Sequence, residues 1–201
     1  MQQLTKSWLR ASDHFANSVL EANRATLAAL GFSNGGQSET RQTKPNVESV
    51  AYDEQGWTDT RTVESPEDIQ TGDVVTFSKT ISEEDVRSFA RASGDTNRLH
   101  LDDSFASETR FKGRIAHGTL VSGLISAALA RLPGVVVYLS QDTRFLSPVE
   151  IGERLTAEVE VVEVLDTDRF RLSTSVTNED EEAVIDGEAV VLVDPAPDGG
   201  E

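Results

Sequence analysis

The chain has 201 residues, of which 37% are hydrophobic, so it is long enough to bury a core in one domain with room for an appendage. Its 35 acidic residues against 18 basic ones give a net charge of −17, which argues against nucleic-acid binding because no basic face is available to displace phosphate counterions. The chain has no cysteine, which excludes disulfides, thiolate nucleophiles and thiolate metal sites.

The acidic surface and the scarcity of lysine favour a hypothesis about the protein's surroundings. Such a surface suits a salt-rich cytoplasm, where ions screen the self-repulsion of the chain. An ordinary acidic cytosolic protein is the alternative. No apolar run near the start has signal-peptide length, and no apolar run elsewhere is long enough to span a bilayer. We therefore expect a soluble, cytoplasmic protein without a transmembrane segment.

The first part of the chain reads as an extension to a globular domain. Apolar residues between Leu4 and Leu30 recur at three- or four-residue steps and predict an amphipathic helix over residues 1–31, ended by Gly31. This helix is expected to pack on its own domain or on a partner subunit, or to dock a protein or granule surface. Residues 32–64 are polar and predict a linker, which Tyr52 and Trp57 could attach to the domain.

We expect the globular domain over residues 65–194, followed by a flexible tail over 195–201. Alternation over 73–81 predicts a strand. The sequence Ser-Glu-Glu-Asp at 82–85 matches a capping box, so a helix is expected from there to Gly94. Residues 102–108 predict a short helical turn in which Phe105 is the packing residue.

The second half predicts a buried helix and a run of strands. From Gly118 to Leu129 the pattern is apolar around most of the helix, as in a helix buried on several sides. Alternating patterns separated by turn residues predict strands over 135–145, 154–165, 169–178 and 182–193. The order of these elements predicts an α+β fold in which an antiparallel sheet wraps around the central helix.

Asp95 and His100 are the candidates for chemistry, because they lie five positions apart among turn-forming residues. A carboxylate and an imidazole that share a water can carry out general acid-base catalysis, worth about 10²- to 10⁴-fold per group. Gly118, at the start of the buried helix, offers a free N–H that can stabilise an oxyanion, worth on the order of 10²- to 10³-fold. The sequence thus predicts a proton-transfer pair beside an anion-binding backbone.

Two other kinds of site are less well supported. A metal could be held by His100, His117, Asp95 and Asp102, but there is no His-Glu-x-x-His helix and no third histidine at a suitable spacing. His117 is interpreted as a supporting residue at the helix start, and no bound metal is expected. A serine hydrolase is not supported either, since the chain lacks a Gly-x-Ser-x-Gly elbow.

Several separated motifs carry a family resemblance over about residues 78–193. They are Gly-Asp-Thr-Asn-Arg-Leu-His at 94–100, Phe-Ala at 105–106, Phe111, Ile-Ala-His-Gly at 115–118 and Arg-Phe-Leu-Ser-Pro-Val at 144–149. In this order they resemble the MaoC-type (R)-specific enoyl-CoA hydratases. The resemblance implies a hot-dog fold, a homodimer with active sites near the subunit interface, and an acyl-CoA substrate without a further cofactor.

The same resemblance implies roles for individual residues. Asp95 and His100 match the catalytic acid/base pair and Gly118 matches the oxyanion donor, while Asn97 shapes the loop. Ser126 lies where relatives carry a serine on the central helix. Arg98 is a departure, since the family commonly has proline there, and the rigidity that proline confers is absent.

The implied reaction is reversible hydration of trans-2-enoyl-CoA, which could supply (R)-3-hydroxyacyl-CoA for polyhydroxyalkanoate synthesis. A hot-dog acyl-CoA thioesterase and a noncatalytic acyl-CoA- or granule-associated binding protein are the alternatives. The preferred acyl length is left open by the sequence, as is the choice between coenzyme A and acyl-carrier protein, although an acidic protein disfavours an acidic carrier.

Overall fold

The computed structural model describes residues 56–196. The amphipathic helix expected over 1–31 and most of the polar linker lie outside these residues, as do the last five residues of the tail. The described part contains one six-stranded antiparallel sheet in the order β1-β2-β4-β5-β6-β3. The strands are β1 (Thr58–Arg61), β2 (Val74–Thr80), β3 (Val135–Phe145), β4 (Arg154–Asp166), β5 (Arg169–Asn178) and β6 (Ala183–Asp194).

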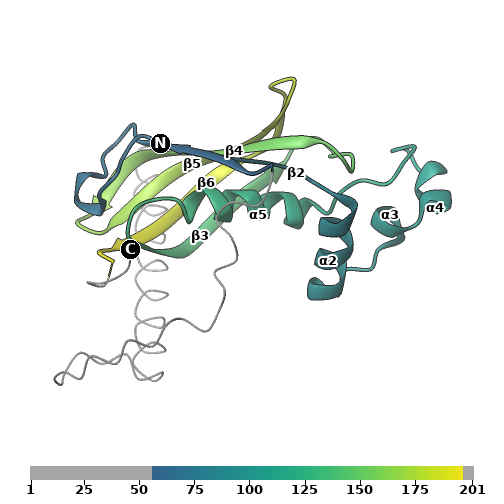
Figure 1. The fold of residues 1–201 in the computed structure, drawn as a ribbon, viewed down its shortest axis with the longest axis horizontal. Coiled ribbons are helices and arrows are strands. Elements are labelled where there is room, and N and C mark those ends of the chain that lie inside the picture. Colours follow the sequence, from purple (N-terminus) through teal and green to yellow (C-terminus); the bar gives the residue numbers. More distant parts are fainter. Residues whose placement is uncertain (1–55, 197–201) are drawn as a thin grey trace, which may run out of the picture. The chain divides into compact units, whose positions relative to one another are not determined.

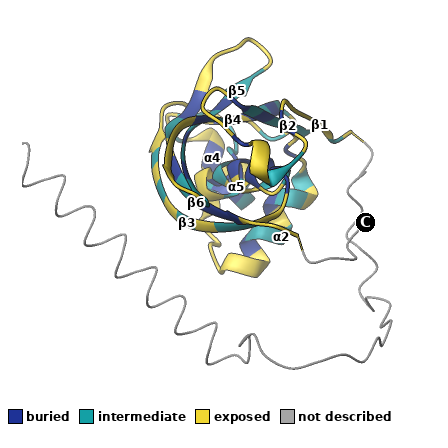
Figure 2. Ribbon diagram, turned by 90° about the vertical axis from the view of Figure 1, so that its left-hand side faces the viewer, coloured by how far each residue is buried: buried dark blue, intermediate teal, exposed yellow. Residues whose placement is uncertain are grey.

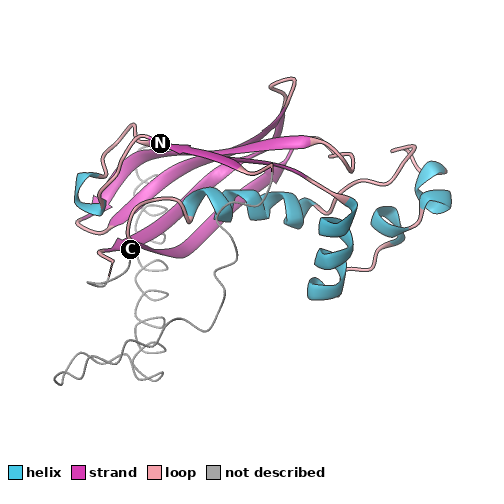
Figure 3. Cartoon of the chain, viewed as in Figure 1, coloured by secondary structure: helices cyan, strands magenta, loops and turns pink. Residues whose placement is uncertain are grey.

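The sheet curves around α5 (Gly118–Leu129), as the sequence predicts, and Figures 1 and 3 show this helix lying along its concave face. The inner face of the sheet and the helix are buried, whereas the outer face of the sheet is more exposed (Figure 2). Residues that alternate along β4 and β5 supply this core, because successive side chains of a strand point to opposite faces. Ile125 and Leu172 are fully buried in it. The expected α+β architecture is therefore confirmed.

The sheet begins earlier than the sequence indicates. The strand β1 lies within the expected linker, ahead of residue 65, and pairs with β2. Its four residues are polar and all exposed, so it has no apolar alternation by which the sequence could reveal it. Trp57 immediately before it packs edge-on against Phe77, with ring centroids 5.3 Å apart. The predicted domain start at residue 65 is therefore too late.

Three helices form a small layer beyond the amino-terminal end of α5 (Figures 1 and 3). They are α2 (Glu83–Ser93), α3 (Arg98–Leu101) and α4 (Asp103–Ser107), and a 3-10 turn (Pro66–Asp68) precedes β2. The predicted capping box of α2 is present: Ser82 Oγ accepts from Asp85 N–H at 3.1 Å, and an Asp85 carboxylate oxygen accepts from Ser82 N–H at 2.8 Å. Gly94 ends the helix with φ 78°, a left-handed conformation that glycine adopts readily.

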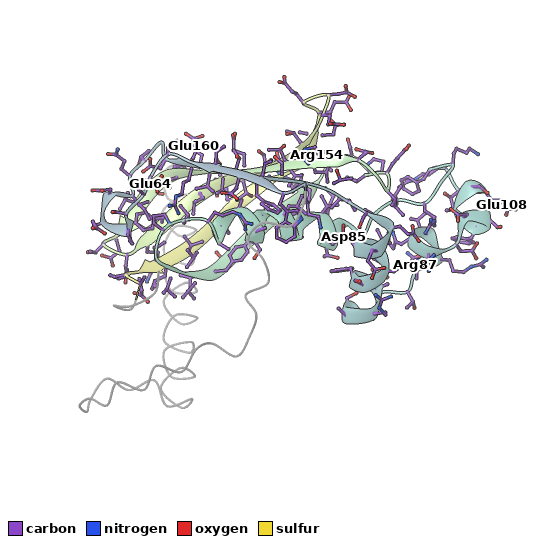
Figure 4. The ribbon with its side chains drawn as sticks, viewed as in Figure 1. Glu64, Asp85, Arg87, Glu108, Arg154 and Glu160 are labelled. Atoms are coloured by element: carbon purple, nitrogen blue, oxygen red, sulfur yellow. The ribbon has the colours of Figure 1, made fainter. Side chains whose placement is uncertain are left out.

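The short helix α4 buries a different residue from the one expected. Phe105 is 37% exposed, whereas the neighbouring Ala106 is fully buried. The Phe105 ring instead lies under the guanidinium of Arg98, whose Cζ is 4.5 Å from the ring centroid. Figure 4 shows the charged side chains that surround this layer, with Asp85 and Arg87 labelled on α2 and Glu108 after α4. No helix within residues 56–196 is long and apolar enough to cross a membrane.

Candidate active site

The loop between α2 and α3 is shaped by its own polar groups. Asp95 N–H donates to Ser93 Oγ at 3.2 Å, and Asn97 N–H donates to a carboxylate oxygen of Asp95 at 3.2 Å. The Asn97 side chain accepts from Leu99 N–H at 3.1 Å and so caps α3. Asn97 thus fixes the turn that presents the Asp95 carboxylate, while the Asp95 side chain is exposed.

His100 follows on α3 and is held in one orientation. Its side chain is 8% exposed, and its Nδ1 lies 2.8 Å from the carbonyl oxygen of Ile115. A carbonyl can only accept a hydrogen bond, so Nδ1 carries the proton when the ring is neutral. The Nε2 of His100 is then left with a lone pair that can accept a proton.

His117 lies directly behind this pair. Its side chain is 1% exposed, and its Nε2 lies 3.0 Å from the backbone carbonyl oxygen of Asp95, to which it donates. The ring stacks at a 32° tilt on His100, with centroids 3.9 Å apart, and also contacts Phe89 at 4.9 Å. Its Nδ1 is buried without a hydrogen-bond partner. These contacts are those of a residue that positions its neighbours.

The three side chains form one compact cluster. A carboxylate oxygen of Asp95 and one ring nitrogen each from His100 and His117 lie within 4.8 Å of one another. A water can bridge a carboxylate and an imidazole over such distances, as acid-base chemistry requires. The same atoms could approach a metal ion, but one ring nitrogen of each histidine is engaged by a backbone carbonyl. Asp102, the fourth metal candidate, instead caps α4 by accepting from Phe105 N–H at 3.0 Å.

Gly118 begins α5, and its N–H has no acceptor within the helix, because the first N–H groups of a helix lack intrahelical partners. Gly118 and His100 line the same cavity of about 290 Å³. The walls are largely apolar and come from three parts of the chain. The full lining consists of His100, Arg110, Phe111, Ile115, Ala116, Gly118, Val121, Phe145, Leu146, Ser147, Pro148, Val149, Val184 and Ile185.

The approach to Gly118 is narrow. A Cβ added at this position would lie 2.9 Å from a ring carbon of Phe145, which is closer than real Cβ contacts. Phe145 ends β3 and also lines the cavity. An added Cβ would therefore require the Phe145 ring to shift, and the missing side chain also leaves room for a carbonyl oxygen to approach the N–H.

Arg98 compensates in part for the absence of proline at its position. It occupies the first position of α3, where proline is favoured in general because the missing N–H is unpaired there. Its guanidinium donates to the Asp102 carboxylate from Nη2 at 2.8 Å and from Nε at 3.0 Å, and so bridges the two ends of α3. These contacts with Asp102, together with the Phe105 ring, brace α3 from its exposed side.

The residues that line the cavity differ in part from those that the sequence suggests. Ser126 is exposed on α5 and does not line the cavity. It lies eight residues after Gly118, which is about 12 Å along a helix. Arg110 and Val184 line the cavity but were given no role from the sequence. Nothing in their local pattern distinguishes them, since they reach the cavity through long-range packing.

The sequence and the fold of this chain are similar to those of known proteins. The family model described as "MaoC like domain" matches residues 67–184. The (R)-specific enoyl-CoA hydratase of Rhodospirillum rubrum is 43% identical over 129 residues, covering 63% of this chain and 90% of that one. The unliganded R-hydratase PhaJ1 from Pseudomonas aeruginosa has a TM-score of 0.62 at 39% identity, covering 70% of this chain and 90% of that one. The (R)-hydratase from A. caviae, described as involved in PHA biosynthesis, has a TM-score of 0.61 at 34% identity. The match covers 64% of this chain and 99% of that one.

Proposed function

The chain belongs to the MaoC-like domain family and has the hot-dog fold of the R-hydratases, and on this premise we propose that it is an (R)-specific enoyl-CoA hydratase. The reaction is the reversible addition of water across the 2,3-double bond of a trans-2-enoyl-CoA. One observation carries the proposal: His100, whose Nε2 is free to accept a proton, and Gly118 line one largely apolar cavity, and a carboxylate oxygen of Asp95, which is not itself a lining residue, lies within 4.8 Å of a His100 ring nitrogen. A general base, a second proton carrier and an oxyanion donor are thus within reach of one small substrate.

In the proposed mechanism the acyl chain occupies the apolar cavity and its thioester oxygen accepts from Gly118 N–H. Asp95 and His100 hold the attacking water between them. The water oxygen bonds to C3 while His100 Nε2 takes a proton from it, and the electron pair of the double bond moves onto the thioester as an enolate. Gly118 N–H and the α5 dipole stabilise that negative charge.

Protonation at C2 completes the addition. Asp95 enters the step as the carboxylic acid and delivers this proton, which leaves it as a carboxylate. The proton that His100 took from the attacking water then passes to this carboxylate through a second water that enters the site, which restores both groups. Dehydration follows the same path in reverse, as microscopic reversibility requires. The scheme uses side chains and backbone of the chain itself, without a further cofactor. An (R)-3-hydroxyacyl-CoA product would be a suitable precursor for polyhydroxyalkanoate.

A homodimer is part of the proposal. The strand β3 is at an edge of the sheet within the described residues, and an exposed edge strand pairs readily with another chain. Val135, Tyr138 and Phe145 on this strand, and Leu146 just after it, are exposed apolar side chains. Phe145 and Leu146 also line the cavity, so a partner on this edge would lie next to the site. Sedimentation analysis of the purified protein tests the dimer.

Hydration of crotonyl-CoA, followed by loss of absorbance of the conjugated thioester and by chiral analysis of the product, tests the activity. The wild type should form the (R)-3-hydroxy product without releasing thiol. Asp95→Asn and His100→Gln should each abolish turnover while the circular dichroism spectrum is kept. Near-normal turnover in either variant would remove that residue from the mechanism.

The same assay separates the alternatives. Release of free thiol, detected with a thiol-reactive dye, would identify a thioesterase. Binding of crotonyl-CoA without any turnover would favour a noncatalytic binding protein. A pull-down with the full chain and with a chain lacking residues 1–55, which keeps β1 and Trp57, would then show whether a protein or granule partner depends on that part, which lies outside the described residues.

A further inference from the structure

The cavity has one formally charged wall residue besides its histidine. Arg110 lies on the loop between α4 and α5, and it stands among lining residues that are otherwise apolar or uncharged. Its side chain is exposed, and its guanidinium Cζ is 4.8 Å from the ring centroid of Phe111, which also lines the cavity. Arg110 thus lines the cavity and is exposed to solvent, which places it at the mouth of the cavity.

Arg110 and its neighbour Lys112 have no carboxylate partner within residues 56–196. The ion pairs there engage nine other basic residues: Arg61, Lys79, Arg87, Arg91, Arg98, Arg114, Arg131, Arg144 and Arg171.

Arg114, on the same loop, differs from Arg110 and Lys112 because it is ion-paired. Arg114 is 15% exposed and is bound by both Glu83 at 2.9 Å and Asp103 at 2.7 Å. A chain with a net charge of −17 offers many carboxylates, yet within residues 56–196 none lies within ion-pair distance of Arg110, which lines the cavity, or of Lys112, two residues further along the chain. These two cations are therefore available to an anion that comes from outside the protein.

The size of the cavity indicates where that anion belongs. A volume of about 290 Å³ holds a short acyl chain and its thioester, but it is at the lower limit for a drug-sized ligand. The nucleotide of a coenzyme A thioester must therefore lie outside, beyond the mouth. Its phosphates carry several negative charges, and a guanidinium binds phosphate through paired hydrogen bonds.

From this juxtaposition we propose that Arg110, together with Lys112, binds the phosphates of the coenzyme A moiety and so selects nucleotide-bearing thioesters. This inference rests on the proposed hydratase function and names the carrier that its site accepts. An acyl-carrier protein is disfavoured, because its acidic surface would be repelled by a chain whose net charge is −17.

Steady-state hydration of two substrates tests the proposal: crotonyl-CoA, and crotonyl-N-acetylcysteamine, which has the same acyl thioester without phosphate. In Arg110→Gln the KM for crotonyl-CoA should rise about tenfold with kcat nearly unchanged, which is the loss of one charge-assisted contact. The double variant Arg110→Gln/Lys112→Gln should raise the KM for crotonyl-CoA further. The KM for the phosphate-free thioester should change less than twofold, and raising salt should increase the KM for crotonyl-CoA more in the wild type than in the double variant.

The matched control is Arg171→Gln, which removes an arginine of β5 that is ion-paired with Glu163 and does not line the cavity. It should leave both KM values unchanged. If Arg110→Gln raised the KM for both substrates equally, or changed neither KM, that result would overturn the proposal. So would a loss confined to crotonyl-acyl-carrier protein, which would assign the cations to a protein carrier.

Failure of the hydratase function itself has a different signature. If the wild type hydrates neither thioester, titration calorimetry with adenosine 3′,5′-bisphosphate still reports on the phosphate subsite. Weaker binding by Arg110→Gln than by the wild type and Arg171→Gln would support the subsite. Equal binding by all three proteins, or none by the wild type, would overturn it.

Discussion

The Nε2 of His117 lies 3.0 Å from the main-chain oxygen of Asp95, so a residue at the start of α5 holds the loop that carries the proposed acid. His117→Ala should remove this bond and leave the Asp95 carbonyl without its donor, at a cost of about 1–3 kcal/mol. We expect kcat for crotonyl-CoA hydration to fall at least tenfold with a smaller change in KM.

His117→Gln is the matched variant, because its amide can donate from nearly the same place. It should recover much of the lost kcat. Equal kcat values for the alanine and glutamine variants would show that the hydrogen bond to Asp95 does not matter for turnover.

Gly118→Ala should impair catalysis for a steric reason. Its Cβ would lie 2.9 Å from the Phe145 ring, so either the ring or the helix start must move. Alanine keeps the N–H, so kcat/KM should fall only as far as this movement displaces the donor from the thioester oxygen, by up to about 10²-fold, the value of one oxyanion donor. Gly118→Ala/Phe145→Leu should recover part of the loss if the ring is the obstacle.

Gly123→Ala is the control on the same helix, since nothing lies within 4 Å of its added Cβ. Alanine has a higher helix propensity, so this variant should gain up to about 1 kcal/mol of stability and keep its activity. A loss of activity in Gly123→Ala would mean that α5 tolerates no change, whatever the role of Gly118.

Asp85 should link stability to pH. Burial alone would raise the pKa of its carboxyl, but hydrogen bonds from Lys79 and from Ser82 outweigh burial and hold the pKa below its usual 3.8. A depressed pKa stabilises the folded state above the unfolded-state value, and this stabilisation is lost as the pH falls through the folded-state value. Asp85→Asn should therefore lower the free energy of unfolding at pH 7 by about 1 kcal/mol, the typical worth of a cap.

Urea titrations of both proteins across a range of pH check this prediction. The difference between wild type and Asp85→Asn should shrink as the pH falls below 3.8, because the carboxyl of the unfolded chain is protonated there before that of the folded protein, whose pKa is lower. Glu84→Gln, on the exposed face of α2, should have little effect at any pH. A difference for Asp85→Asn that stays constant down to pH 2 would contradict the linkage.

Salt should stabilise the protein if its acidic surface is suited to a salt-rich cytoplasm. Raising the salt from about 0.01 M to about 1 M shortens the Debye length from about 30 Å to about 3 Å, which screens the self-repulsion of the chain. We expect Tm, followed by circular dichroism, to rise over this range. Neutralising the exposed acidic run at 179–182, between β5 and β6, should reduce that rise. A Tm independent of salt would indicate an ordinary acidic protein.

Much of the fold could be predicted because its signals are local. The strands β3 and β5 were expected at their observed bounds, since each alternates with period two between turn residues. The strand β1 was not expected, because Thr58–Arg61 is polar throughout and becomes a strand only by pairing with β2. Phe105 was expected to be the packing residue of its helical turn, but its ring contacts the Arg98 guanidinium at the surface and Ala106 is buried instead.

In the candidate site, too, contacts between residues near in sequence could be predicted, whereas contacts between distant residues could not. Asp95 and His100 are five residues apart, so a single turn can bring them together, and the sequence could suggest their partnership. The hydrogen bond from His117 to the Asp95 carbonyl spans 22 residues and has no sequence signature. Phe145 and Val184 also line the cavity, and they come from β3 and β6, strands that are paired with each other but are far from Asp95 and His100 in the sequence.

The ring of Phe145 occupies the space next to Gly118 where another residue would have its Cβ. Phe145 nevertheless belongs to the edge strand β3 and is 56% exposed. A second copy that covers this edge would hold the ring in place, and separation of the copies would free it. Association and turnover would then be coupled, so that activity per protomer falls as the protein is diluted. Such a protein would work at full rate only above the concentration at which its protomers pair.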